Sequence, residues 1–246
     1  MLSLREKNEI EHGRFLLRSR AEAVWGHDGI AGQRRVLRRI SEFTRLGKLG
    51  PGRKILELGC GTGVFTAELL KTGAEIVALD LSPELLASAK SKISAANVSF
   101  IEGNAEKLSE FFSAGEFDAV VGNSMLHHLD EVKTLESVFN ILAAGGSAVF
   151  SEPNMLNPQI ALQKNIKWLK KAMGDSPDET AFFRWRVGSL LKKIGYTDIK
   201  VSPFDFLHPA VPDNLAPFME KVGLLLEKLP VVREIAGSLL IYARKP

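Results

Sequence analysis

The chain has 246 residues, of which 45% are hydrophobic and 25% are charged, and this composition is typical of a globular protein. A chain of this length buries a hydrophobic core without disulfide bonds or metal ions, and we predict no metal site. The formal net charge of +3 is too small to indicate a nucleic-acid partner.

The sequence also predicts the compartment. Cys60 is the only cysteine, so no disulfide bond can form within the chain, which fits a reducing environment. The first residues carry charge where a signal peptide needs an apolar stretch, and no segment reaches the roughly 18 uninterrupted apolar residues of a membrane-spanning helix. We therefore expect a soluble, cytoplasmic protein.

Ahead of residue 50 the sequence predicts two helices, over residues 3–25 and 33–46. Apolar residues of the first helix, such as Ile10, Phe15 and Leu16, are placed to form a packing surface. The connector over residues 26–32 follows Trp25, and we expect it to reach over the functional site.

From residue 53 onward, short runs rich in Val, Ile, Leu and Phe alternate with segments of helical periodicity. This alternation is typical of βαβ units, in which parallel strands form a sheet with helices on both faces. The predicted strands span residues 54–58, 75–79, 98–101, 117–121 and 147–151, and the helices between them include 64–71, 83–95 and 129–142.

The pattern is less regular after residue 152. We predict helices over 158–173 and 180–194, a strand over 196–207, a helical insertion at about 212–228 and a last strand over 238–244. The helix over 158–173 carries four lysines and Trp168 beside apolar residues, which is compatible with weak peripheral membrane contact. This helix and the insertion either form a lid over a lipid-like ligand or, as is commoner for such faces, pack on the sheet.

The strongest functional motif is the run E-L-G-C-G-T-G over residues 57–63, which follows a predicted strand and opens a helix. Glycines at this place let the backbone turn sharply and approach a ligand, while the helix N-terminus offers unpaired N–H groups. Open α/β sheets bind their ligands at this carboxyl end of the strands. The motif therefore predicts a cofactor site.

A dinucleotide site is the alternative, and the position of the third glycine argues against it. The fingerprint G-x-G-x-x-G/A would place Gly or Ala at position 64, but Val64 stands there and the third glycine is Gly63. Glu57 also fits poorly beside a pyrophosphate, whereas it suits a cationic sulfonium and an ammonium group.

Asp80 ends the second predicted strand at the same edge of the sheet. A carboxylate there is able to accept hydrogen bonds from both hydroxyls of a ribose, with Leu81 against an adenine face. The other role open to Asp80 is to cap the next helix, but Ser82 before Pro83 suits that role better.

These motifs resemble those of the class I S-adenosylmethionine (SAM)-dependent methyltransferases. Residues 57–63 resemble the first motif of that family, D-L-S-P-E-L-L at 80–86 the second, G-N-A-E-K-L at 103–108 the third and residues 117–129 the fourth. The turn at 142–147 is similar to the family's L-K-P-G-G. The resemblance covers about residues 50–152, and it departs at Asn104, where the family usually has Asp.

The resemblance implies a Rossmann-like, doubly wound α/β sheet of seven strands with an antiparallel last strand and a helical insertion between the last two strands. It implies one domain with an N-terminal helical cap (1–49), a cofactor-binding core (50–152) and an acceptor-side half (153–246). It also implies SAM as the cofactor, with Asn104 and Ala105 bonded to the adenine. The expected cofactor residues are Glu57, Gly59, Cys60, Gly61, Gly63, Asp80, Leu81, Asn104, Ala105 and Asn123.

Methyl transfer is an in-line displacement at an activated electrophile, so catalysis depends mainly on holding the nucleophile about 3 Å from the methyl carbon. A base is needed only where the acceptor must lose a proton. His127 and His128, after the fourth predicted strand, are the candidate catalytic residues because a histidine pKa near neutrality suits a base. A structural role is the alternative for each, as it is for Glu152 to Asn154 at the end of the fifth strand.

The sequence predicts a small-molecule or lipid-like acceptor and leaves open whether oxygen, carbon or nitrogen is methylated. A non-catalytic SAM-binding module and an NAD-dependent oxidoreductase are the alternatives. An RNA methyltransferase is disfavoured because the charge is near neutral and no RNA-binding module is appended.

Overall fold

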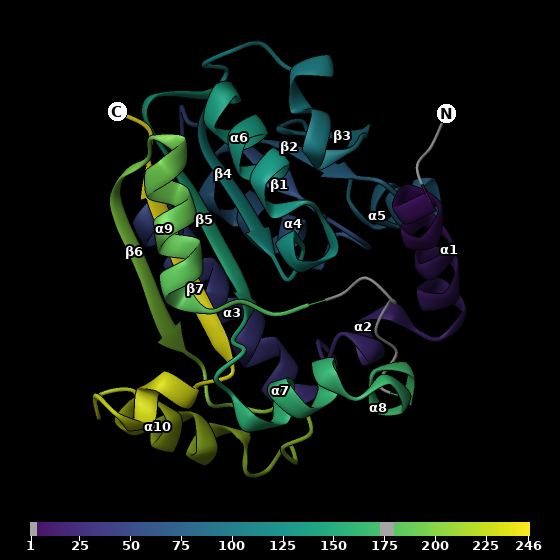
Figure 1. The fold of residues 1–246 in the computed structure, drawn as a ribbon. Coiled ribbons are helices and arrows are strands. Elements are labelled where there is room, and N and C mark those ends of the chain that lie inside the picture. Colours follow the sequence, from purple (N-terminus) through teal and green to yellow (C-terminus); the bar gives the residue numbers. More distant parts are fainter. Residues whose placement is uncertain (1–3, 173–179) are drawn as a thin grey trace.

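The computed structural model describes residues 4–172 and 180–246, which fold around a seven-stranded sheet (Figure 1). The strand order is β3-β2-β1-β4-β5-β7-β6, and β7 runs antiparallel to both of its neighbours while the other pairs are parallel. This arrangement confirms the predicted α/β sheet with an antiparallel last strand. The strands are β1 (Lys54–Leu58), β2 (Glu75–Asp80), β3 (Val98–Glu102), β4 (Phe117–Asn123), β5 (Leu142–Pro153), β6 (Thr197–Phe204) and β7 (Ser238–Arg244).

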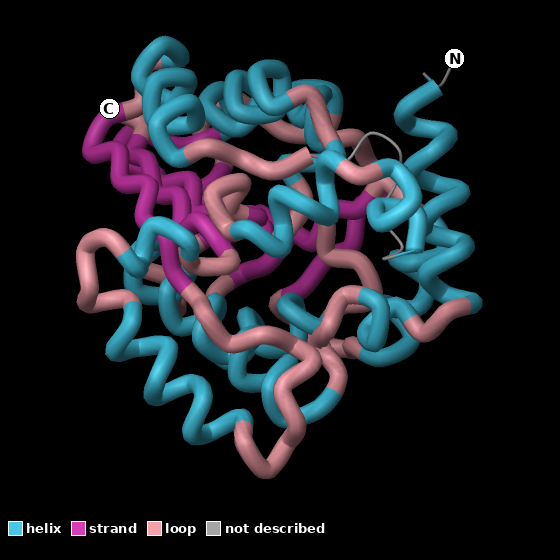
Figure 2. The backbone as a smooth tube through the Cα atoms, turned by 60° about the horizontal axis from the view of Figure 1, so that its bottom comes forward, coloured by secondary structure: helices cyan, strands magenta, loops and turns pink. Residues whose placement is uncertain are grey.

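Helices precede, connect and follow these strands, as Figure 2 shows with helices in cyan and strands in magenta. The α-helices are α1 (Leu4–Arg18), α2 (Ala21–Val24), α3 (Gly29–Gly47), α4 (Val64–Leu69), α5 (Pro83–Lys92), α6 (Glu131–Ile141), α7 (Pro158–Asn165), α8 (Lys167–Ala172), α9 (Arg184–Ile194) and α10 (Ala216–Leu226). Short 3₁₀ segments are η1 (Leu70–Thr72), η2 (Ala105–Glu110), η3 (Leu126–His128) and η4 (Val232–Ile235). Within the described part of the chain, no helix is both long enough and apolar enough to cross a membrane.

The central strands are apolar on both sides because helices cover both faces of the sheet. Leu135 of α6 and Leu191 of α9 pack with Leu56 of β1 in one core cluster. Phe43 of α3 packs with Ile55 of β1 in the cluster on the other side. Figure 1 shows α6 and α9 in front of the sheet and α3 behind it.

Local features divide or shorten the helices predicted over 3–25, 158–173 and 180–194. The helix expected over 3–25 is α1 and α2, separated at Arg20, whose φ of 58° is left-handed. The helix expected over 158–173 breaks at the extended Ile166 between α7 and α8, and residue 173 lies outside the described residues. The helix expected over 180–194 begins only at Arg184, because Phe182 forms a bridge with Asn154.

A row of arginines on α3 ties the segment between β6 and β7 to the body of the sheet. Arg38 forms a two-point ion pair with Glu227 (2.7 and 2.5 Å), and Arg34 pairs with Glu220. Arg39 is 3% exposed and reaches Asp205 at 2.7 Å. The helix therefore positions the loop after β6 by charge as well as by apolar packing.

The Arg39 guanidinium depends on its partners because water does not reach it. Besides Asp205 it donates hydrogen bonds to the hydroxyls of Ser151 (3.1 Å) and Ser238 (2.9 Å), on β5 and β7. Burial alone would raise the pKa of Asp205, but Arg39 and Arg35 outweigh it and lower that pKa to about 2. Buried charges held in this way are destabilising when one partner is removed.

Replacing Arg39 with Met should therefore lower the free energy of unfolding by about 3 kcal/mol, because the buried Asp205 keeps only Arg35 as a cationic partner and two buried hydroxyls lose their donor. The matched control is Arg34→Met on the same helix, whose partly exposed ion pair should be worth less than about 1 kcal/mol. Urea unfolding of the two variants measures both values. Equal losses would show that burial does not set the strength of these pairs.

Candidate active site

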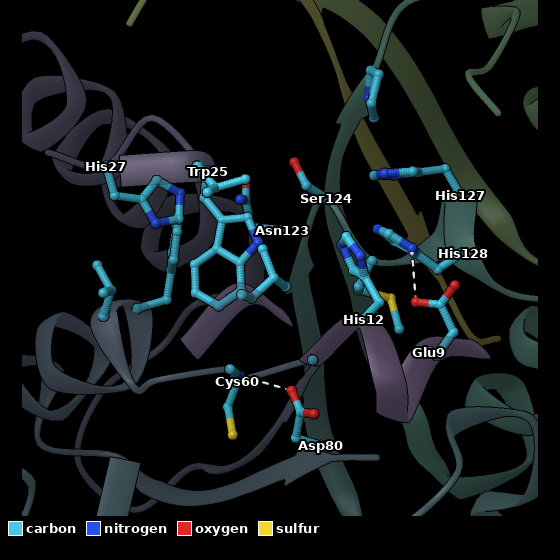
Figure 3. A pocket seen from close by; sticks show the side chains of 18 of the residues that line it. Glu9, His12, Trp25, His27, Cys60, Asp80, Asn123, Ser124, His127 and His128 are labelled. Carbon is cyan, nitrogen blue, oxygen red and sulfur yellow. Dashed lines mark hydrogen bonds and ion pairs between the residues drawn. The ribbon is translucent and has the colours of Figure 1, made fainter. Parts of the chain in front are cut away.

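A cavity of about 550 Å³ lies at the carboxyl ends of the parallel strands (Figure 3). Its wall is formed by the loops after β1 to β4, by α1 and α2, by α7 and by the loop after β6. Eight of the ten predicted cofactor residues and both predicted catalytic histidines line it. These residues are Gly59, Cys60, Gly61, Asp80, Leu81, Asn104, Ala105, Asn123, His127 and His128.

The glycine loop takes backbone conformations that side chains disfavour. Gly61 has a φ of 55°, and a Cβ atom there would lie 2.8 Å from the ring of Trp25. Gly63 has a φ of 86° and stands at the start of α4. A Cβ atom there would lie 2.7 Å from the side chain of Ile93, the residue directly after α5. Gly61 therefore shapes the cavity wall, whereas Gly63 lets α4 pack and is not part of that wall.

Asp80 joins the loops after β1 and β2. One carboxylate oxygen accepts the N–H of Gly61 at 2.8 Å and the other accepts the N–H of Ser82 at 2.9 Å. Burial raises the pKa of Asp80, and these backbone donors act against that rise. Each oxygen keeps a lone pair for a further donor. Ser82 caps α5 by accepting the N–H of Leu85, as expected from the sequence.

Glu57 lies behind the glycine loop and outside the cavity wall. Its side chain is buried, and one carboxylate oxygen accepts the hydroxyl of Thr66 at 2.6 Å. Burial raises the pKa of Glu57 to about 7, with the nearby Asp80 adding to the rise. The structure therefore does not bring Glu57 together with the lining residues, although it supports the loop that they form.

Asn104 has protein partners at both ends of its amide. Its oxygen accepts the N–H of Glu106, and its nitrogen donates to Glu6 of α1 (both 2.8 Å). Because a carbonyl oxygen has two lone pairs, one acceptor position is left for a ligand.

Helix α1 forms part of the wall, which the sequence did not predict. Glu9, His12 and Leu16 line the cavity, and Arg14 holds the helix to Glu84 of α5 at 2.7 Å. The sequence held one indication of this close packing, which is Gly13 inside a helical run. A Cβ atom at Gly13 would lie 2.6 Å from the Ser82 hydroxyl.

The connector after α2 does reach the site, as predicted. Trp25 and His27 line the cavity, and the His27 ring meets Phe65 edge-on at 5.5 Å between centroids (Figure 3). Burial, followed by the charges of Arg35 and Arg39, lowers the pKa of His27 to about 4. His27 is therefore neutral near pH 7.

The two predicted catalytic histidines lie side by side, with 4.3 Å between ring centroids. His127 is buried, and its Nδ1 lies 2.7 Å from Oε2 of Glu152 at the end of β5. The other oxygen of Glu152 accepts the N–H groups of Met125 (3.0 Å) and Leu126 (2.9 Å). His128 lies 3.0 Å from Glu9 of α1. Burial raises the pKa of Glu152 to about 7, against the effect of the backbone donors.

The end of the cavity away from the glycine loop is lined mainly by residues of the second half of the chain, together with Arg35 of α3. Arg35 and Asp205 form an ion pair there at 3.1 Å. Nδ1 of His208 accepts the N–H of Ala210, and its Nε2 lies 2.8 Å from the Gln159 amide. The remaining wall there is mixed. Its apolar residues are Pro153, Ile160, Phe206, Leu207 and Pro209, and its polar residues are Asn157, Gln163 and Lys164.

Comparison with known proteins identifies the family. A family model described as a methyltransferase domain matches residues 55–146. An uncharacterized methyltransferase of Synechocystis is 33% identical over 159 residues, covering 62% of this chain and 70% of that protein. A ubiquinone biosynthesis O-methyltransferase of Methylococcus capsulatus is 36% identical over 101 residues, covering 40% of this chain and 42% of that protein.

A solved structure shares the fold. It is a Haloferax volcanii methyltransferase in complex with the Trm112 methyltransferase activator, with a TM-score of 0.67, 19% identity and coverage of 92% of this chain and 96% of that chain. The likeness to the Synechocystis methyltransferase, at 33% identity over 70% of that protein, shows that the chain belongs to the class I SAM-dependent methyltransferases, whose cofactor is SAM.

The buried carboxyl group of Glu57 predicts a pH dependence of stability. Its pKa rises from 4.5 to about 7 on burial, so in this pH window the folded state keeps a proton that the unfolded state has lost. The free energy of unfolding should therefore fall by about 3 kcal/mol as the pH rises through the window. Glu57→Gln should remove this part of the dependence.

Urea unfolding of wild type and variant without cofactor, at about pH 5 and about pH 8, measures the difference. The exposed Glu102, replaced by Gln at the end of β3, is the control. A difference between wild type and Glu57→Gln that stays constant with pH would contradict the interpretation.

Proposed function

We propose that the chain transfers the methyl group of SAM to a small-molecule or lipid-like acceptor. The observation that supports this most directly is the continuous cavity, which joins the glycine loop and Asp80 to His127 and His128 and to the loop after β6. Cofactor and acceptor would meet within one enclosed space. Catalysis would then rest on in-line placement of the nucleophile, with the positive charge of the sulfonium lost as its bond to the methyl carbon breaks.

The cofactor would occupy the part of the cavity next to β1 to β4. Asp80 would accept hydrogen bonds from the ribose hydroxyls, Leu81 would lie against the adenine, and Ala105 would donate its N–H to that ring. Asn104 would accept from the adenine amino group with its remaining lone pair. Gly59, Cys60 and Gly61 would let the backbone approach the amino-acid part.

One polar atom in the cavity supports this placement independently. Oδ1 of Asn123, at the end of β4, is buried and has no hydrogen-bond partner among the described residues. A buried acceptor without a donor is unfavourable, so a ligand donor such as an ammonium group would satisfy it. Glu57 and Gly63 would act through the shape of the loop, since neither reaches the cavity wall.

The acceptor would enter from the second half of the chain, with residues 1–49 as a cap and 153–246 as the acceptor side. The wall at Leu207 packs against Ala216, the first residue of α10. Phe218 and Leu225 of α10 and Val231 after it are 64%, 61% and 84% exposed. Large exposed apolar side chains near a cavity suit a lipid-like acceptor or contact with a membrane surface.

Calorimetric titration with S-adenosylhomocysteine, and with NAD in parallel, tests the cofactor assignment. We expect binding of S-adenosylhomocysteine with a dissociation constant in the micromolar range and no binding of NAD. Binding of NAD alone would contradict the proposal. A labelled methyl group that passes from SAM into small molecules of a cell extract would separate an enzyme from a non-catalytic SAM-binding module.

Replacing Asp80 with Ala should weaken binding of S-adenosylhomocysteine by about 1–3 kcal/mol, because charge-assisted hydrogen bonds to the ribose are lost. Glu75→Ala is the matched control, since Glu75 begins the same strand at the opposite edge of the sheet and is exposed. The same titration measures both. Unchanged affinity in Asp80→Ala would exclude the ribose assignment.

A further inference from the structure

All five histidines of the chain line the one cavity. Three of them form a row, with ring centroids 6.4 Å apart for His12 and His128 and 4.3 Å apart for His127 and His128 (Figure 3). A carboxylate contacts the row from each side, Glu9 from α1 and Glu152 from β5. One part of the cavity wall therefore holds three histidines and two carboxylates in contact with one another.

The contact between Glu152 and His127 differs from the others in how firmly it is held. Glu152 is 1% exposed and lies in the sheet between β4 and β7. Both lone pairs of its Oε1 are used by the N–H groups of Met125 and Leu126, at the start of the short η3 segment that carries His127. This fixes the orientation of the carboxylate and leaves Oε2 aimed at Nδ1 of the histidine, 2.7 Å away.

At about pH 8, above the Glu152 pKa of about 7, the carboxylate is ionised and has no proton to donate, so the hydrogen of the 2.7 Å contact belongs to Nδ1 of His127. With the proton on Nδ1, Nε2 of the neutral ring is the acceptor. A third group that fixes the tautomer of a base in this way is a recurring arrangement in enzymes that remove protons from hydroxyl groups.

We propose that Glu152 is a positioning residue that holds His127 in the Nδ1–H tautomer, so that Nε2 accepts the proton of a weakly acidic hydroxyl group on the methyl acceptor. This inference rests on the proposed methyl transfer and adds the class of nucleophile, which is oxygen. An amine attacks through its lone pair without a base, whereas a hydroxyl group must lose its proton as it attacks.

The step balances without any further reactant. The acceptor oxygen forms a bond to the methyl carbon as its proton moves to Nε2 of His127. The bond between that carbon and sulfur breaks, and its electron pair stays on sulfur. The products are the methyl ether, S-adenosylhomocysteine with an uncharged sulfur, and an imidazolium ring on His127 beside the Glu152 carboxylate. The imidazolium then returns its proton to water.

The variant Glu152→Gln tests the tautomer directly. Its amide oxygen can still accept the N–H groups of Met125 and Leu126, so the amide nitrogen then faces Nδ1 and donates to it. The His127 proton is thereby forced onto Nε2, where it blocks the base. The fold is expected to survive because the two side chains have nearly the same shape.

The measurement is ¹⁵N NMR of histidine-labelled protein with S-adenosylhomocysteine at about pH 8, with the His127 signals assigned from His127→Gln. We expect the Nδ1–H tautomer in the wild type and the Nε2–H tautomer in Glu152→Gln. Glu9→Gln, which changes the carboxylate next to His128, should leave the His127 tautomer unchanged.

The Nε2–H tautomer or a persistent imidazolium in the wild type would overturn the proposal, and so would an unchanged tautomer in Glu152→Gln. Calorimetry with S-adenosylhomocysteine should give the same affinity for wild type and Glu152→Gln. If wild type does not bind S-adenosylhomocysteine, the proposed methyl transfer itself is contradicted. The tautomer of His127 can then still be measured in the protein without ligand, so the two failures are distinguishable.

Discussion

The hydrogen bonds that backbone N–H groups donate to buried carboxylates are the interactions on which the site depends. Asp80 holds Gly61 and Ser82, and Glu152 holds Met125 and Leu126. A carboxylate out of water is unfavourable unless donors surround it, so each of these groups dictates the path of the loop that supplies the donors. The loops after β1, β2 and β4 are thereby drawn to the same edge of the sheet, where the cavity forms.

Burial of carboxylates near the site also lowers the stability of the protein without its cofactor. The pKa values of Glu57 and Glu152 are both raised to about 7, so their ionisation at neutral pH is resisted. A cationic ligand in the cavity would offset part of this penalty. The arrangement resembles other binding sites in which stability is lost so that affinity is gained. Asp205 shows the opposite case: Arg35 and Arg39 lower its pKa to about 2, and it ties the loop after β6 to α3 without titrating near neutral pH.

The strands and the glycine loop could be predicted because their information is local. Apolar runs, Gly59 to Gly63 and an acidic residue at a strand end determine the βαβ units and their common edge. The contacts of α1 could not be predicted, since Glu6 meets Asn104 and Glu9 meets His128 across about a hundred residues of sequence. Glu57 was assigned to the cofactor from its place in the motif, but the pleat of β1 directs its side chain to Thr66.

The N-terminal helix covers one side of the site, at the carboxyl ends of the strands. Strand ends alone would leave Asp80 and the histidines in water, where hydrogen bonds to a ligand compete with hydration. Arg14 of α1 pairs with Glu84 and Gly13 lies against Ser82, so α1 covers part of the cavity. The Arg14–Glu84 pair is partly exposed and adds little to stability, whereas the hydrogen bond from Asn104 to Glu6 is buried. Helix α1 is therefore held in part by residues of the cavity wall itself, Asn104 and His128, so binding at that wall and the position of α1 are linked.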